Sequence, residues 1–227
     1  MKKFLLIAGW LIVVCAAVLF FVWPKGPDLS KYEGLKDPQI NKLEKHKVIA
    51  VTLTGEPEKI AGEGIAALYK MYYSLKQTDK TVMAVPKARW TGGTDTPKDK
   101  WSAEFALQVP EEVLELPAQK DGLKIELKYW DYGAAGEAAE ILHLGSYDDE
   151  TFDVNRLMEF VKDNKYILAG KHEEEYIKGP GMFFKGDPKN YQTIIRYAVV
   201  KGKGGKHGPV KISAKKAAKT AVKKGKK

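Results

Sequence analysis

The order of predicted elements repeats along the chain, and this repeat is the strongest constraint on the fold. Between residues 48 and 109 the side-chain pattern predicts a strand, a helix and two further strands, and between residues 137 and 200 the same series returns. Two copies at similar spacing predict two similar sheets, each with one helix on one face. Because a helix covers one face only, the other faces can line a shared groove, where pockets form. The predicted fold class is α+β, a tandem of strand–helix–strand–strand modules with pseudo-twofold symmetry and a groove between them.

The first module is predicted from local patterns. Residues 48–54 are rich in β-branched side chains and end at Gly55, which indicates a strand. Pro57 suits the first turn of a helix, along which apolar residues recur every three or four positions. Strands are predicted over 81–90 and, from alternation, over 101–109. The apolar stripe of the helix consists of Ile65, Leu68, Tyr69, Tyr72 and Leu75.

The second module follows an amphipathic strand predicted over 123–129. A strand over 137–144 leads to Asp148, which supplies helix-start chemistry, and Asn164 is a suitable helix end. The last strand is predicted over 191–200. The apolar stripe of this helix consists of Val154, Leu157, Met158 and Val161.

The N-terminal segment is strongly apolar. Phe4–Trp23 is a run of 20 residues without a charged side chain, long enough for a helix to span a bilayer core. A signal peptide has a shorter apolar core, so the run favours an uncleaved anchor over residues 1–24. The sequence thus predicts a single-pass membrane protein that contacts the membrane through residues 4–23. Lysines on both sides of the run leave open which side of the membrane the domain faces.

The net charge of +9 comes from the C-terminal tail. Residues 201–227 hold eleven lysines and no acidic residue, so the rest of the chain has 27 basic and 29 acidic residues, a net of about −2. This low-complexity tail is predicted to be disordered and could bind anionic lipid or nucleic acid, or act only as a solubilising segment. The predicted domains are a linker over 25–46 and a folded domain over 47–200, with modules at about 47–110 and 122–200.

One predicted strand carries three consecutive glutamates. His172 to Pro180 follows the second helix and ends in a Gly-Pro turn. Alternation places His172, Glu174 and Tyr176 on one face of this strand, and Glu173, Glu175 and Ile177 on the other. Glutamate is depleted in strands. Two explanations fit: an edge strand whose charges discourage aggregation, or a Glu and a Tyr that project together into a ligand site.

Several segments of the second module carry a family resemblance. The stretches Ile141–Glu150, Leu157–Val161, Glu174–Tyr176 before Gly179-Pro180, and Thr193–Arg196 resemble the GyrI-like small-molecule-binding domain, also called the effector-binding domain of AraC-type regulators. The resemblance covers roughly residues 45–200 and is stronger in the second half. It implies the tandem fold described above, with a ligand groove between the modules. Similar domains also occur behind an N-terminal membrane anchor.

The resemblance also implies a site. The family's strand Glu, followed two residues later by Tyr, falls on Glu174 and Tyr176, which implies that they contact a small amphipathic, possibly cationic aromatic ligand. Glu175 departs from the family pattern, which usually has an apolar residue there. A carboxylate among aromatic side chains is poorly solvated, and a cation would gain both its charge and the ring faces. The candidate aromatic walls are Trp90, Trp101, Trp130 and Tyr147.

Three function classes are compatible with the sequence. A membrane-anchored small-molecule binder without catalytic residues comes first; a hydrolase that uses Glu174 and Tyr176, and a membrane scaffold or receptor, are the alternatives. We predict no cofactor and no metal, because His143 and His172 have no paired ligands nearby in the sequence. The single cysteine, Cys15, excludes a disulfide within the chain and a cysteine-based metal site. No helix-turn-helix or Gly-rich phosphate loop is recognisable.

Overall fold

The computed structural model describes residues 26–93, 95–119, 122–180 and 186–202. The elements up to the middle of the chain are η1 (Leu29–Lys36), β1 (Gln39–Lys42), β2 (His46–Thr54), α2 (Pro57–Ser74), β3 (Lys87–Thr91), η2 (Lys98–Lys100) and β4 (Ser102–Gln108). The remaining elements are β5 (Glu126–Trp130), β6 (Glu137–Leu144), η3 (Tyr147–Asp149), α3 (Thr151–Asp163), β7 (Tyr166–Leu168), β8 (His172–Lys178), η4 (Pro188–Asn190) and β9 (Gln192–Lys201).

The strands form one antiparallel sheet of nine strands in the order β1-β6-β9-β8-β3-β4-β2-β5, with β7 paired to the end of β9. The two halves share this sheet because β3 pairs with β8 over Lys87–Trp90 and His172–Glu175. The predicted pair of separate sheets is therefore replaced by one continuous sheet. The α+β class is confirmed, and the first half has the predicted strand–helix–strand–strand order. The second half has an additional short strand, β7, between α3 and β8. The pseudo-twofold symmetry stays a prediction.

β8 lies inside the sheet, with β3 on one side and β9 on the other. The interpretation of this strand as an exposed edge is therefore wrong. Edge strands use charge to discourage pairing with other chains. Here Glu173 and Glu174 are buried, and their partners within the sheet explain the charges.

Two short strands cross between the halves. β1 precedes β2 in the chain but pairs with β6, and β5 precedes β6 but pairs with β2. The segment predicted as a linker thus contributes η1 and β1 to the fold, and Leu35 of η1 packs on Leu142 and Ile194. The Pro and Gly content of this segment indicates a linker. Local composition cannot reveal that β1 pairs with β6, almost one hundred residues further along the chain.

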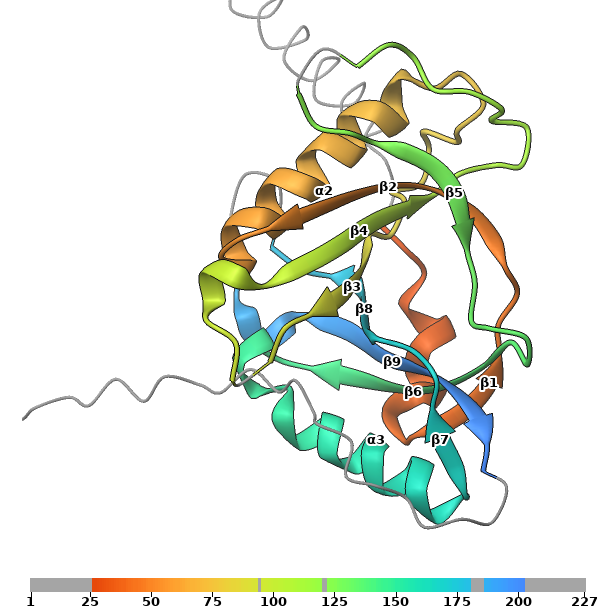
Figure 1. The fold of residues 1–227 in the computed structure, drawn as a ribbon, viewed down its shortest axis with the longest axis vertical. Coiled ribbons are helices and arrows are strands. Elements are labelled where there is room, and N and C mark those ends of the chain that lie inside the picture. The colour runs from red at the N-terminus through yellow and green to blue at the C-terminus, as the bar shows by residue number, and fades with distance from the viewer. Residues whose placement is uncertain (1–25, 94, 120–121, 181–185, 203–227) are drawn as a thin grey trace, which may run out of the picture.

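Both helices cover the same face of the sheet. Figure 1 shows α2 and α3 at opposite ends, with β3 and β8 between them. The predicted apolar stripes are confirmed as the packing surfaces: Leu68 and Tyr72 of α2 are buried, as are Leu157 and Val161 of α3. α2 approaches β4 so closely that a Cβ on Gly64 would lie 2.7 Å from the Phe105 ring.

The opposite face is covered by chain segments and the 3₁₀ helix η1 rather than by α-helices. Trp130 and Tyr132, which end β5 and follow it, pack on Val48, Ala106 and Ala138, and η1 covers the β6–β9 end. This arrangement buries both faces at the centre of the sheet, where β3, β8 and β9 run side by side.

Within the described ranges, no helix combines the length and the apolar character that a membrane crossing requires. α2, with 18 residues, is the longer of the two α-helices described, and it carries Glu58, Lys59 and Glu63 in its first two turns. This finding contradicts the predicted single-pass membrane localisation. Phe4–Trp23, the run behind that prediction, lies outside the described residues, as does the tail from residue 203.

Candidate functional site

Glu174 lies at the centre of the sheet on the helix-covered face. Its register partners are Ala88 on β3 and Ile195 on β9, which belong to the cores beneath α2 and α3 respectively. His172 and Tyr176 share this face, as alternation predicts. The regular pairing breaks between Tyr176 and Lys178, where the register with β9 shifts. Glu174 lies before this shift, so regular pairing on both sides of β8 fixes its position between the cores of the two helices.

A chain of hydrogen bonds runs through this carboxylate. Trp90 Nε1 donates to Tyr176 Oη at 3.0 Å, and Tyr176 Oη donates to Glu174 Oε2 at 2.7 Å. The other oxygen, Oε1, lies 2.8 Å from His172 Nε2. Glu174 is only 4% exposed, so these contacts replace the water that a carboxylate would otherwise bind.

The chain continues beyond the imidazole. His172 Nδ1 lies 2.7 Å from Tyr197 Oη, and the two rings meet edge to face. A neutral imidazole satisfies every contact if Nε2 carries the hydrogen toward Glu174 and Nδ1 accepts from the Tyr197 hydroxyl. This tautomer follows from the network of donors and acceptors. Glu174 then accepts one hydrogen bond on each of its carboxylate oxygens.

Two more tyrosine rings, Tyr147 and Tyr191, extend from the ring of Tyr176. The Tyr147 ring lies perpendicular to the Tyr176 ring at 5.7 Å, and Tyr191 lies 5.3 Å from Tyr147. Tyr147 reaches this position because residue 179 is a glycine, where a Cβ would lie 2.7 Å from the Tyr147 hydroxyl. Together with Trp90, these rings form an aromatic wall beside the carboxylate.

The tyrosines of the site remain protonated. Burial raises the pKa of Tyr176 well above its usual value, and the charge of Glu174 raises it further. Burial also raises the pKa of Tyr147 and Tyr197, and the nearby charges of Glu174 and Glu150 act in the same direction. The common cause besides burial is the negative charge of Glu174 and Glu150.

Glu150 belongs to this site, although the sequence analysis does not single it out. It precedes α3 and follows η3, and it is 5% exposed. Donor atoms of Glu150, His172 and Glu174 all lie within 4.8 Å of one another. In the sequence, Glu150 follows two aspartates and is indistinguishable from helix-start chemistry. Only the packing of α3 against the sheet brings it to β8.

The structure brings some predicted wall residues to Glu174 and not others. Trp90 and Tyr147 contact Tyr176 directly. Trp101 packs edge to face on Trp90 at 6.1 Å and donates its Nε1 hydrogen to Thr96 O, so it supports the wall from behind. Trp130 lies on the opposite face, where its Nε1 donates to Glu173 Oε2 at 2.9 Å. It is fully buried there because β5 crosses to the other half of the sheet.

Glu173 and Glu175 lie on the opposite face, as alternation predicts, inside a buried ion network. Arg196 Nη1 lies 2.7 Å from Glu173 Oε1 and 2.9 Å from Glu175 Oε2, and Arg196 Nη2 lies 2.6 Å from Glu140 Oε1. Arg89 Nε donates to Glu173 Oε2 at 2.9 Å. Glu175, which departs from the family pattern, therefore has Arg196 as its ion-pair partner.

The cations of this network keep its carboxylates ionised. Burial alone would raise the pKa of Glu173, but the charges of Arg196 and Arg89 outweigh it and hold the pKa below its usual value. The same balance, with Lys87 as the largest lowering contribution, holds the pKa of Glu175 down. The two faces of β8 thus differ: Glu173 and Glu175 pair with arginine and lysine side chains, whereas Glu174 is hydrogen-bonded by His172 and Tyr176.

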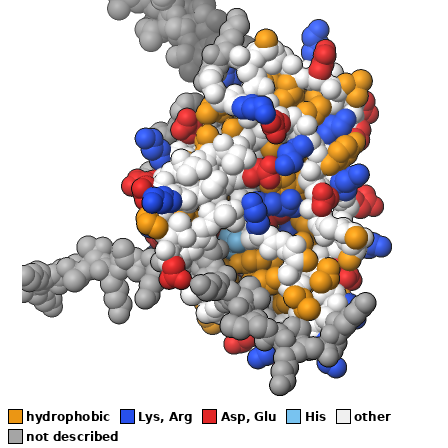
Figure 2. All heavy atoms as spheres, viewed as in Figure 1, with side chains coloured by type: hydrophobic (Ala, Val, Ile, Leu, Met, Phe, Trp, Pro, Cys, Tyr) orange, Lys and Arg blue, Asp and Glu red, His pale blue; other side chains and the backbone are white. Residues whose placement is uncertain are grey.

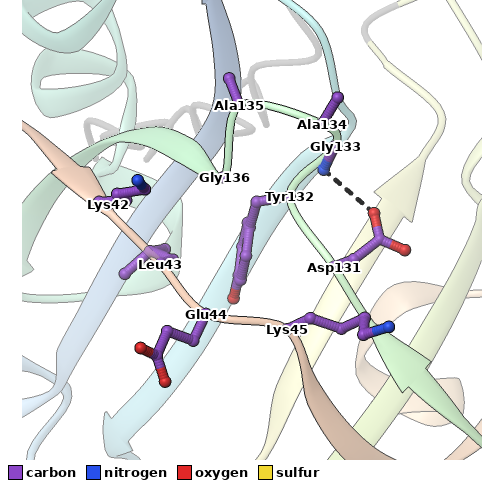
Figure 3. Close-up of a pocket in the computed structure, with 10 residues that line it drawn as sticks. All are labelled: Lys42, Leu43, Glu44, Lys45, Asp131, Tyr132, Gly133, Ala134, Ala135 and Gly136. Carbon is purple, nitrogen blue, oxygen red and sulfur yellow. Dashed lines mark hydrogen bonds between the residues drawn. The ribbon is translucent and has the colours of Figure 1, made fainter.

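A surface pocket of about 720 Å³ lies over the ion network, not over Glu174. It is lined by Lys42–Lys45 from the β1–β2 connection and by Asp131–Gly136 from the β5–β6 connection. Figure 3 shows the Tyr132 side chain between these segments, and the Tyr132 hydroxyl donates to Glu173 Oε1 at 3.0 Å. Basic and acidic side chains are interspersed on the face shown in Figure 2.

No family model matches the sequence, and no curated protein matches it significantly. Solved structures do match. Two described as hydrolases from Listeria innocua have TM-scores of 0.59 and 0.58 and identities of 19% and 16%; the matches cover 78% and 73% of this chain and 100% and 92% of theirs. The EcmrR C-terminal domain has a TM-score of 0.53 at 18% identity, with 73% of this chain and 98% of that domain covered. At these identities the likeness shows the fold, which agrees with the GyrI-like effector-binding fold.

Proposed function

We propose that this chain is a small-molecule-binding domain whose ligand contacts Glu174 and Tyr176. The observation that carries the proposal is the buried Glu174 carboxylate, held by His172 and Tyr176 beside the aromatic wall of Trp90, Tyr147 and Tyr176. The preferred ligand is amphipathic and cationic. Its charge pairs with the carboxylate, and its apolar part packs on the rings.

The physical chemistry of the site supports this ligand class. A carboxylate loses hydration when it is buried, and hydrogen bonds from neutral groups compensate only in part. A cation that arrives beside Glu174 recovers the remaining electrostatic energy and also interacts with nearby ring faces. On the other face of β8, the protein's own arginines already fulfil this role for Glu173.

The hydrolase alternative rests on a different observation, the 2.7 Å hydrogen bond between Tyr176 and Glu174. In this alternative, Glu174 takes a proton from water, and the Tyr176 hydroxyl donates to the oxygen on which negative charge develops. Two of the structures with this fold are described as hydrolases, which is compatible with such chemistry on this fold.

The proposal is tested by titrating the full chain with aromatic quaternary ammonium ions and with neutral analogues of the same shape, using calorimetry. Glu174→Gln keeps the shape and removes the charge. We expect it to weaken cation binding by roughly tenfold or more, since a lost charge-assisted contact is worth about 1.5–3 kcal/mol, and to leave neutral analogues unaffected.

The matched control is Glu159→Gln, which removes an exposed carboxylate from α3 and should leave every affinity unchanged. Equal cation affinity in wild type, Glu174→Gln and Glu159→Gln would contradict the proposed site. So would the absence of saturable binding for every compound.

A further inference from the structure

We propose that Glu150, His172 and Glu174 form a binding site for one divalent transition-metal ion, with Zn²⁺ as the representative. Their donor atoms lie within 4.8 Å of one another. All three residues are buried, with exposed fractions of 5%, 7% and 4%. They come from two elements, β8 and the start of α3, so the site joins the sheet to the helix.

The donor set suits such an ion. One imidazole nitrogen and two carboxylate oxygens are ligands that Zn²⁺ accepts, and two carboxylates balance its charge. With bonds of about 2.0–2.1 Å, neighbouring ligand atoms of a tetrahedral ion lie about 3.3 Å apart. His172 Nε2 and Glu174 Oε1 are 2.8 Å apart, so they must separate by about half an ångström. The metal then replaces the hydrogen bond between them.

The surrounding hydrogen bonds already orient two of the ligands. Tyr197 Oη lies 2.7 Å from His172 Nδ1, which leaves Nε2 directed toward Glu174. With a metal on Nε2, the imidazole hydrogen resides on Nδ1 and is donated to Tyr197 Oη. Tyr176 holds Glu174 Oε2, which leaves Oε1 toward His172. Metal-binding histidines characteristically have such a partner on the second nitrogen.

The electrostatic environment supports a cation at this position. Carboxylate oxygens of Glu150 and Glu174 lie within 4.8 Å of each other, and both side chains are buried. Two carboxylates this close repel each other in a medium of low dielectric constant. A divalent ion placed between them removes this repulsion.

The inference goes beyond the proposed function and does not rest on it, because Glu150 and His172 are not required for an organic cation. The metal and such a cation would compete for the charge of Glu174. The tests remain separate: the metal is measured alone, and the organic ligands are measured after treatment with a chelator.

The experiment uses the full chain in a His207→Gln background, which removes the histidine outside the described residues. The chain is stripped with EDTA, and Zn²⁺ binding is measured by calorimetry. Replacement by Co²⁺ gives a visible absorption spectrum that reports the coordination number. We expect one ion per chain, and at least tenfold weaker binding in both Glu150→Gln and His172→Gln. Tyr197→Phe should weaken binding by about 10–100-fold, because it removes the partner of the imidazole.

The control is His143→Gln, which changes a buried histidine that contacts Asp153 and Ser146 and is not one of the three proposed ligands. Its affinity for Zn²⁺ should equal that of the background protein. The proposal is overturned if the folded protein binds no stoichiometric Zn²⁺, or if Glu150→Gln binds it with unchanged affinity. Should His172→Gln fail to fold by circular dichroism, Glu150→Gln and Tyr197→Phe decide the question.

Discussion

Arg196 and Glu173 lie opposite each other on β9 and β8, and their side chains form an ion pair of 2.7 Å with exposed fractions of 6% and 2%. The same guanidinium contacts Glu175 and Glu140. One cation therefore serves three carboxylates beneath the centre of the sheet. A buried charge without its partner is far more costly than an exposed one, which makes this arginine the most sensitive position of the network.

Arg196→Met should destabilise the fold by about 3–5 kcal/mol, because it leaves buried carboxylates without their shared cation. The measurement is the free energy of unfolding in urea. Arg156→Met is the matched control, since Arg156 pairs with Asp37, which is 88% exposed, and with Asp153. Its cost should stay within about 1 kcal/mol. Similar losses for the two variants would show that burial of the network does not determine its contribution.

Acid should destabilise the protein through Glu173 and Glu175. Their pKa is held below the unfolded value, so their contribution is fully present above about pH 4.5 and is lost as the pH falls through the folded pKa. The free energy of unfolding should therefore decline steadily from pH 5 downward. Arg196→Met removes the arginine that pairs with both Glu173 and Glu175. The free energy of unfolding of this variant should therefore decline less steeply with falling pH. A steeper decline in the variant would contradict this origin of the pH dependence.

Two glycines of α2 should respond in opposite directions to alanine. A Cβ at Gly62 meets nothing within 4 Å, so Gly62→Ala should stabilise the protein by about 0.5–1 kcal/mol through helix propensity. A Cβ at Gly64 would lie 2.7 Å from the Phe105 ring, so Gly64→Ala should cost about 1–3 kcal/mol through overpacking. Thermal unfolding of the two variants measures the difference, and stabilisation by both would mean that α2 can move away from β4.

Tyr176→Phe separates binding from hydrolysis. The ring stays in place and only the hydroxyl that donates to Glu174 is lost. In a binder, aromatic cations should still bind, with affinity changed by less than about tenfold, since one hydrogen bond contributes about 0.5–1.5 kcal/mol. In a hydrolase, turnover should fall by about 10²–10⁴ while the substrate still binds. Product analysis by mass spectrometry decides: a compound that wild type converts and Tyr176→Phe only binds would favour the hydrolase.

Side-chain patterns in the sequence predict the helix and strand faces of this fold, because neighbouring residues determine them. The helical stripe through Leu68 and Tyr72 and the alternation along β8 are determined by side chains a few positions apart. The pairing of β3 with β8, which joins the two halves, depends on the register between segments far apart in the sequence. The periodicity of side chains along one segment gives no information on that register. The same reason explains why Glu175 is unexpected in sequence, since its partners Arg196 and Lys87 come from other strands.

The candidate site divides in the same way. Glu174 and Tyr176 are two residues apart, so a single strand suffices to place them together. Glu150 precedes α3 and Tyr197 lies on β9, so only the assembled fold brings them to His172. Trp130 was a reasonable wall candidate by residue type, but the crossing of β5 places it on the other face.

The strands β1 and β5, which each pair with the other half of the chain, make the two halves depend on each other. β1 is continuous in sequence with one half and hydrogen-bonded to the other, and β5 has the reverse arrangement. A fragment that ends between residues 110 and 122 would carry one strand without its acceptor and one acceptor without its strand. Each half, cut free, would therefore lack a strand pairing that it makes in the complete fold.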